Sequence, residues 1–225
     1  MTSLIAAAIV FVLLHLGVAG TRLRDRVVAL LGERAYLGLF SLLSLVVIVW
    51  LAGAYARAPY LPTWGMLPAW RWVMVVLMLP AMLLVVIGLA TPSPTAVGQE
   101  RRAAEPVRGI LRITRHPFLT GVALWAVLHL IGNGDGASLV FFGAFAVVAI
   151  LGPASIDEKR QRRLGAAAWT PFAAQTSIIP FAAILAGRNQ LVLAELGWWR
   201  VLAGLVVYAL VLGGHGPLFG ISPLG

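Results

Sequence analysis

The chain alternates between long apolar runs and short segments that carry nearly all of its charge. Six runs contain no Asp, Glu, Lys or Arg, and each is near or above the roughly 20 residues that a helix needs to cross a hydrocarbon core. These runs are Thr2 to Thr21, Ala35 to Ala56, Trp72 to Gln99, His116 to Gly134, Gly136 to Ile156 and Val201 to Gly225. The pattern predicts an all-α fold, a polytopic integral membrane bundle of about six transmembrane helices.

Proline, glycine and short apolar stretches predict the connections. The Asn-Gly-Asp-Gly segment that begins at Asn133 predicts a tight turn, so that the fourth and fifth spans form a helical hairpin. Loop 57–71 is rich in proline and tryptophan and is expected at the outer interface. The apolar stretch from Ile178 to Gly187 is too short to cross, so we expect a short interfacial or re-entrant helix there. Residues 1–225 are expected to form a single transmembrane domain.

The composition agrees with this class of protein and excludes others. Apolar residues make up 60% of the chain and charged residues 11%, whereas a soluble domain has about one quarter charged residues. The chain has no cysteine. A disulfide framework, a thiolate nucleophile and an iron–sulfur site are therefore excluded.

The basic residues predict how the helices are oriented. Fourteen of the 17 lysines and arginines lie in loops 22–34, 91–115 and 157–188, which alternate along the chain. The positive-inside rule places such loops in the cytoplasm. We therefore expect a bacterial inner-membrane protein with both termini on the periplasmic side. The net charge of +9 then reflects topology and contact with anionic membrane lipids, and it does not indicate nucleic-acid binding.

Three of the four histidines lie inside apolar runs rather than at their ends, and an ionisable side chain inside such a run is expensive and marks a functional hypothesis. They are His15, His129 and His215. His129 follows Trp125 by four residues and Gly121 by eight, which places all three on one helical face. Such a stripe would suit a flat ligand held against the helix. Close packing of two membrane helices through a small residue produces the same pattern.

The depths of the histidines limit which of them can share a ligand. At 1.5 Å per residue, His15 lies about 10 Å from the basic rim, His129 about 21 Å and His215 about 22 Å. Depth alone therefore pairs His129 with His215. His116 stands beside Arg115 at the rim itself, roughly 20 Å along the helix from His129, so it cannot join the deeper site.

A set of motifs that covers nearly the whole chain resembles the NnrU family of bacterial membrane proteins linked to denitrification. The motifs are LLHLG, GERAYLGLFSLLSLV, RGILRITRHPFLTGVALWAVLHLIGNGD, DEKRQRRLG, WTPF with TSIIPF, and HGPLFGISP. The resemblance extends to the 15-cis-zeta-carotene isomerases of plants and cyanobacteria. Those integral membrane enzymes use haem b, held by two histidines, to isomerise a central cis double bond.

The resemblance implies specific residues and chemistry for this chain. The haem-ligand histidines fall on His15 in LLHLG and on His129 in LHLIGNGD, whereas depth favours His215 as the partner of His129. Trp125 and Gly121 would then lie beside a bound haem b. A carotenoid-isomerase-like protein would admit a lipophilic polyene from the membrane, and a denitrification protein would instead use the haem to sense or handle nitric oxide.

A weaker resemblance implies different chemistry at the basic rim. The RHPFLTG segment, followed by an apolar hairpin and an acidic pair, is similar to membrane methyltransferases of the isoprenylcysteine carboxyl methyltransferase type. It implies an S-adenosylmethionine site near His116, Glu158 and Arg163. The chain departs from that family in having Asp157 before Glu158, where a Glu pair is usual. The acidic pair would equally serve as ion-pair partners for the basic residues that follow it, and a non-catalytic assembly factor for a respiratory complex is a third hypothesis.

Overall fold

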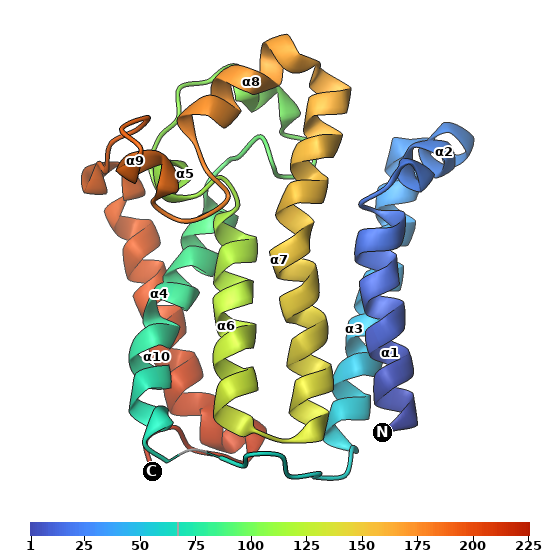
Figure 1. Cartoon of the computed structure of the whole chain (residues 1–225), viewed down its shortest axis with the longest axis vertical. Coiled ribbons are helices and arrows are strands. Elements are labelled where there is room, and N and C mark those ends of the chain that lie inside the picture. The colour runs from blue at the N-terminus through green and yellow to red at the C-terminus, as the bar shows by residue number, and fades with distance from the viewer. Residues whose placement is uncertain (67) are drawn as a thin grey trace.

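The fold is an all-α bundle, as the apolar pattern predicts. The computed structural model describes residues 1–66 and 68–225, and within them it contains helices and a single isolated β-bridge. Six apolar helical segments run side by side along the long axis of the molecule (Figure 1). They are α1 (Thr2–Val12) with its π-helical continuation η1 (Leu13–Val18), α3 (Glu33–Ala56), α4 (Trp70–Ala90), α6 (Pro117–Asn133), α7 (Gly136–Leu164) and α10 (Trp198–Phe219).

Most of these segments meet the length and composition of a membrane-spanning helix. Four of them, α3, α4, α7 and α10, are long and apolar enough to cross a membrane, and the chain is accordingly a membrane protein. The first expected span differs from the prediction, because the chain bends by 80° after η1 and continues as the charged helix α2 (Arg22–Leu31). Counted as one broken span, this pair is the fifth. The remaining expected span, α6, is an apolar helix of 17 residues, about 25 Å long.

The short helices gather at one end of the bundle. Figure 1 places α2, α8 (Ala166–Gln175) and the single-turn helices α5 (Ile110–Ile113) and α9 (Ala182–Leu185) at the end opposite both labelled termini. Two 3-10 turns complete the connections, η2 (Glu100–Ala104) and η3 (Leu193–Leu196). The three basic loops therefore share one end of the molecule. The short helix expected between Ile178 and Gly187 is α9.

The predicted turn between α6 and α7 is present and is built from local hydrogen bonds. Gly134 adopts the left-handed conformation, with φ of +57°, which glycine tolerates best. The Asp135 carboxylate accepts hydrogen bonds from the amides of Ala137 and Ser138 and so caps α7. Loop 57–71 approaches this turn through Thr63, whose amide donates to the Gly134 carbonyl oxygen at 2.9 Å. Leu67 of that loop lies outside the described residues.

Helices α4 and α6 pack closely because glycine lies at their contact. A Cβ atom on Gly121 would stand 2.6 Å from the Ala81 carbonyl oxygen and 2.9 Å from the Val85 amide nitrogen. No side chain can occupy that space without moving the backbone of α4. Gly121 therefore fixes the distance between the two helices, as small residues do in membrane bundles.

We expect Gly121→Ala to destabilise the protein, because the added methyl group must push α4 and α6 apart. Overpacking of this kind costs about 1–3 kcal/mol. Gly143→Ala in α7 is the matched control, since a Cβ there meets nothing within 4 Å. The control should leave stability unchanged or raise it by up to about 1 kcal/mol through helix propensity. Unfolding temperatures in detergent would measure both, and equal temperatures for Gly121→Ala and the native protein would contradict this account.

Candidate functional site

Aromatic rings connect two of the intramembrane histidines across three helices. His15 lies in η1, and its ring centroid is 4.4 Å from that of Phe11 in α1. Phe11 packs at 4.8 Å against Phe145 of α7, which lies 5.5 Å from Trp125 of α6. Trp125 in turn lies 5.1 Å from His129. His15 and His129 are therefore joined by a continuous aromatic chain, and a π-helical turn of the kind that carries His15 is frequent at functional sites.

The third intramembrane histidine lies directly beside His129. The His215 ring of α10 has its centroid 6.5 Å from that of His129, with an angle of 18° between the two planes. On the α7 side, Phe142 stacks on His129 at 4.5 Å. Phe219 lies 4.9 Å from His215 and extends the aromatic surroundings along α10. His129 is thus held among Trp125, Phe142 and a second imidazole.

Backbone hydrogen bonds fix which nitrogen of each ring is free. The Nδ1 atoms of His15, His129 and His215 lie 2.8, 2.9 and 2.7 Å from the carbonyl oxygens of Phe11, Trp125 and Ile221. A carbonyl oxygen only accepts, so in the neutral ring Nδ1 carries the proton and Nε2 carries the lone pair. Metal-ligating histidines have this arrangement, with the second ring nitrogen donating to a carbonyl or carboxylate.

The free nitrogens differ among the three rings. In His15, Nε2 lies 3.2 Å from the Ser44 hydroxyl oxygen, which can donate to it. Within residues 1–66 and 68–225, Nε2 of His129 and of His215 has no hydrogen-bond partner. Two lone pairs are therefore available in neighbouring rings on α6 and α10.

The donor chemistry of this pair fits a metal ion held by imidazole nitrogens. The His129 and His215 rings are neighbours, with centroids 6.5 Å apart, and each has a lone pair on Nε2 that could bind a metal. The described residues contain no group of three or more His, Asp or Glu side chains placed to hold a metal. Two imidazoles alone match an iron whose other ligands come from a haem ring.

The two other residues of the stripe that contains His129 are Trp125 and Gly121, and they make different contacts. Trp125 packs beside His129, as the stripe predicts, whereas Gly121 packs against α4. His15 and His129, the pair that the family resemblance implies, have no direct ring contact in the described part of the chain. They are separated by Phe11, Phe145 and Trp125. The neighbour that depth favours, His215, is the one that contacts His129.

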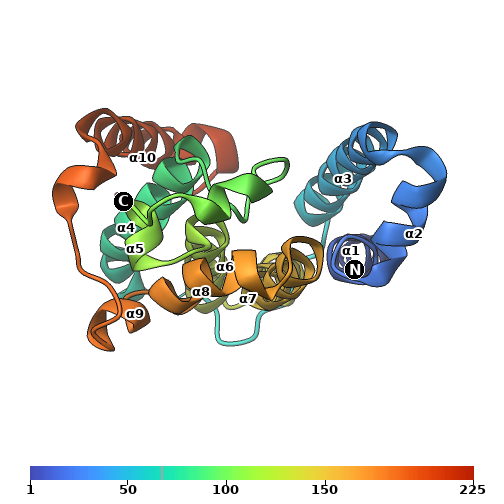
Figure 2. The same cartoon turned by 90° about the horizontal axis from the view of Figure 1, so that it is seen from above.

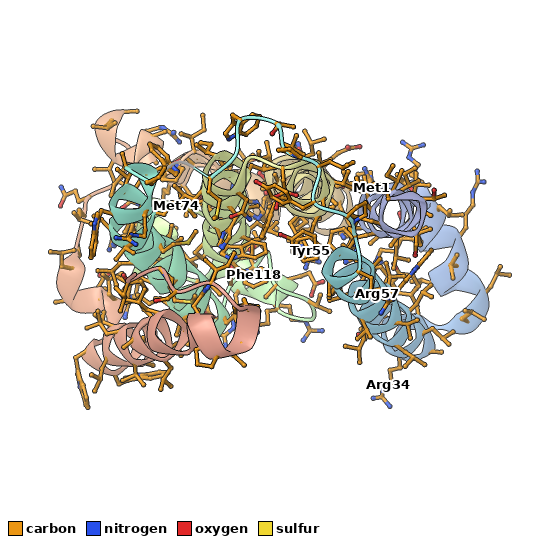
Figure 3. All side chains as sticks on the ribbon, turned by 90° about the horizontal axis from the view of Figure 1, so that it is seen from below. Met1, Arg34, Tyr55, Arg57, Met74 and Phe118 are labelled. Atoms are coloured by element: carbon orange, nitrogen blue, oxygen red, sulfur yellow. The ribbon has the colours of Figure 1, made fainter. Side chains whose placement is uncertain are left out.

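The sequence did not predict the polar pair of Tyr55 and Ser138, which lies beside the aromatic chain at the end of the bundle that carries the termini. The Tyr55 hydroxyl oxygen lies 2.8 Å from that of Ser138, and the Tyr55 ring stacks on Phe141 at 4.5 Å. Figure 3 shows Tyr55 on the side of α3 that faces the middle of the molecule. The available signal was the run of phenylalanines at 141, 142 and 145 in α7, whose spacing fits one broad helical face.

At the basic end, His116 belongs to a separate buried network. Its side chain is 2% exposed, and Nε2 lies 2.7 Å from Oδ1 of Asp157. The other carboxylate oxygen, Oδ2, lies 2.8 Å from Nε of Arg115. Arg115 also donates to the Thr176 hydroxyl at 3.0 Å. These contacts join the start of α6 to α7 and to the end of α8.

The three rim residues proposed for S-adenosylmethionine are each paired elsewhere. His116 is bonded to Asp157, while Glu158 is 70% exposed and pairs with Arg162 one turn later in α7. Arg163 pairs with Glu33, 3.2 Å away on α3. In the described residues these three side chains form no hydrogen bond or ion pair with one another, and two of their pairs, His116 with Asp157 and Arg163 with Glu33, join different helices.

Another ion pair at this end involves Glu195 of η3. Its carboxylate accepts two hydrogen bonds from Arg112, at 2.7 and 3.0 Å, and one from the amide of Gly109 at 2.8 Å. These bonds, with that from the guanidinium of Arg112 the strongest, lower the pKa of Glu195 to about 2. The contact ties the segment before α10 to α5.

This lowered pKa predicts a pH-dependent contribution to stability. Glu195 ionises near pH 4.3 in an unfolded chain, so its ion pair stabilises the fold fully above that pH and less as the pH falls toward 2. The unfolding temperature of the native protein should exceed that of Glu195→Gln at pH 7. The difference should shrink when both are measured at pH 3. A difference of equal size at the two pH values would show that the ion pair is not its cause.

Comparison with known proteins finds a matching family and relatives by sequence. The profile of a family described as NnrU protein matches residues 3–223. A 15-cis-zeta-carotene isomerase, chloroplastic, from Zea mays is 32% identical over 83 residues, and its counterpart from Arabidopsis thaliana is 37% identical over 87 residues. Each match covers 37% of this chain and 22% of the relative, so the chain spans about a fifth of those proteins. No solved structure matches the chain.

Proposed function

The chain belongs to the NnrU family, and we propose that it is a haem b protein of the bacterial inner membrane with a carotenoid-isomerase-like role. The observation that carries the proposal is His129, an imidazole with a free Nε2 among aromatic rings and 6.5 Å from a second imidazole. The matches to proteins named as 15-cis-zeta-carotene isomerases support the isomerase-like role.

The residues of this chain would bind and orient the group. His129 would hold the iron through Nε2, while the hydrogen bond from Nδ1 to the Trp125 carbonyl fixes the orientation of the ring. The rings of Trp125 and Phe142 would exclude water and present flat apolar faces. When bound, haem iron supplies a centre that changes redox state or takes a small ligand.

A lipophilic polyene fits the surroundings of this site. The histidines lie within apolar helices, and the aromatic rings between them offer contacts along an extended conjugated molecule. His129 and His215 are only partly buried, so the site is not sealed by protein. A substrate of this class would reach the site laterally from the lipid phase.

An absorbance spectrum tests the proposal directly. Purified protein in detergent, supplied with excess haem, should show a Soret band and the visible bands of low-spin iron. The loaded protein should then convert 15-cis-zeta-carotene to an isomer that chromatography separates. Absence of a Soret band under saturating haem would overturn the haem proposal. Haem binding without isomerisation would overturn the isomerase role and retain a haem protein.

The orientation in the membrane is part of this proposal and has its own test. Loops 22–34, 91–115 and 157–188 share one end of the molecule (Figure 1), and their arginines favour the cytoplasm. Reporter fusions after Arg26 and after Gly136, which lie at opposite ends, should give opposite signals, with Arg26 cytoplasmic. Equal signals at the two sites would contradict the topology.

A further inference from the structure

A cavity of about 330 Å³ lies at the basic end of the bundle, away from the histidines. It is bounded by the end of α4, the segment before α5, α8 and the start of α10. Figure 2 shows α4, α5 and α10 grouped on the side of the molecule away from α1 and α3. Residues that line it include Thr91, Pro94, Arg108, Leu111, Phe172 and Arg200.

The cavity has an excess of positive charge over negative charge. Its two carboxylates already have partners, because Glu195 is bonded to Arg112 and Glu105 to Arg102 at 2.9 Å. Arg108 and Arg200 also line the cavity, and neither forms an ion pair within the described residues. The cavity therefore presents positive charge that the protein itself leaves uncompensated, which favours an anionic ligand.

Two hydrogen-bonding atoms of the lining residues are also unsatisfied. The Oγ1 atom of Thr91 and the Nε atom of Arg200 are buried and have no hydrogen-bond partner in the described residues. A buried polar atom left in this way is unfavourable and requires an explanation. A hydroxyl and a guanidinium N–H can both donate, so these two groups match a ligand that carries several acceptor oxygens. Phosphate has that chemistry and is matched by the fork of an arginine.

An apolar groove near the cavity, on η3 and the start of α10, indicates the class of molecule to which the phosphate belongs. It is lined by Leu193, Gly197, Trp198, Val201 and Leu205, at the outer surface of η3 and the start of α10. Trp198 is 78% exposed there, and exposed tryptophan at the end of a membrane helix is typical of head-group depth. The groove adjoins the cavity, because a Cβ atom on Gly197 of the groove would stand 3.4 Å from Nη1 of Arg200. A cationic cavity beside an apolar groove is complementary to an amphiphile.

We propose that this cavity binds the phosphate of an anionic membrane lipid, whose apolar part lies in the groove along the start of α10. Arg108 and Arg200 provide the positive charge, and Thr91 adds a hydroxyl donor. The site ties together α4, α5 and α10 at the basic rim. It is independent of the haem proposal, because none of its residues contacts the three intramembrane histidines.

Lipid binding by the whole protein in detergent tests the proposal. The probe is phosphatidylglycerol, with phosphatidylcholine as the zwitterionic comparison, and native mass spectrometry counts the lipids retained. Each of Arg108→Gln and Arg200→Gln should weaken phosphatidylglycerol binding by about tenfold or more, the loss expected for one hydrogen bond to a charged group. Arg34→Gln is the matched control, since Arg34 is exposed and points away from the bundle (Figure 3). It should bind like the native protein.

Several outcomes would overturn the proposal. Equal retention of phosphatidylcholine and phosphatidylglycerol would remove the role of the phosphate charge. Complete displacement of the lipid by inorganic phosphate at equal concentration would indicate a site for a free anion. Because Arg108 is exposed, its substitution should not disturb folding, so native binding by Arg108→Gln would also reject the site even if Arg200→Gln failed to fold.

Discussion

Replacing His129 by alanine is expected to abolish the low-spin haem spectrum completely. His129 is the histidine on which the two arguments agree, since depth pairs it with His215 and the family resemblance pairs it with His15. Its Nδ1 is bound to the Trp125 carbonyl, which leaves the lone pair of Nε2 for the iron. Without that ring, Trp125 and Phe142 offer only apolar aromatic surfaces, and His215 alone would hold the iron.

The measurement is the absorbance of purified protein reconstituted with haem. His116→Ala is the matched control, because His116 lies at the rim in contact with Asp157 and should leave the spectrum unchanged. Circular dichroism of both variants would establish that they remain helical. A folded His129→Ala protein that keeps the native spectrum would rule out this residue as a ligand.

The apolar spans could be predicted from the sequence, but the bend that ends the first one could not. The length rule locates apolar runs in the chain, whereas the segment at the 80° bend after η1 is held by contacts with a distant helix. The Gly20 carbonyl accepts a hydrogen bond from Ser155 at 2.8 Å, and the Ala19 carbonyl accepts one from Lys159 at 3.1 Å. These partners lie more than 130 residues away in the chain, so no local pattern reveals them.

In the candidate site, too, some features could be predicted from the sequence and others could not. Counting residues gave the depth of each histidine, and the pair predicted by depth, His129 and His215, is the pair in contact. Counting could not give the rotation of each helix about its axis. That rotation turns Gly121 toward α4 and places Trp125 against the phenylalanines of α7. The proposed lipid site could not be predicted for a related reason, since Arg108 and Arg200 lie far apart in the chain and line one cavity only in the folded protein.

The second ligand of the iron is decided by comparing two single variants. We expect His215→Ala to convert the low-spin spectrum to a high-spin form, because the variant lacks one of the two imidazoles that would hold the iron. His15→Ala should keep the low-spin spectrum. The geometric reason is that His215 lies 6.5 Å from His129 and has a free Nε2, whereas Nε2 of His15 is already bonded to Ser44.

The opposite result would have a definite meaning. High-spin iron in His15→Ala, with low-spin iron in His215→Ala, would support the pairing of His15 with His129 that the family resemblance implies. The aromatic chain through Phe11, Phe145 and Trp125 would then have to open when haem binds, since it separates the two rings. Phe145→Leu distinguishes the two pairings. It removes one aromatic ring between His15 and His129 and leaves the contact between His129 and His215 unchanged. If His215 is the ligand, this variant should retain the native spectrum.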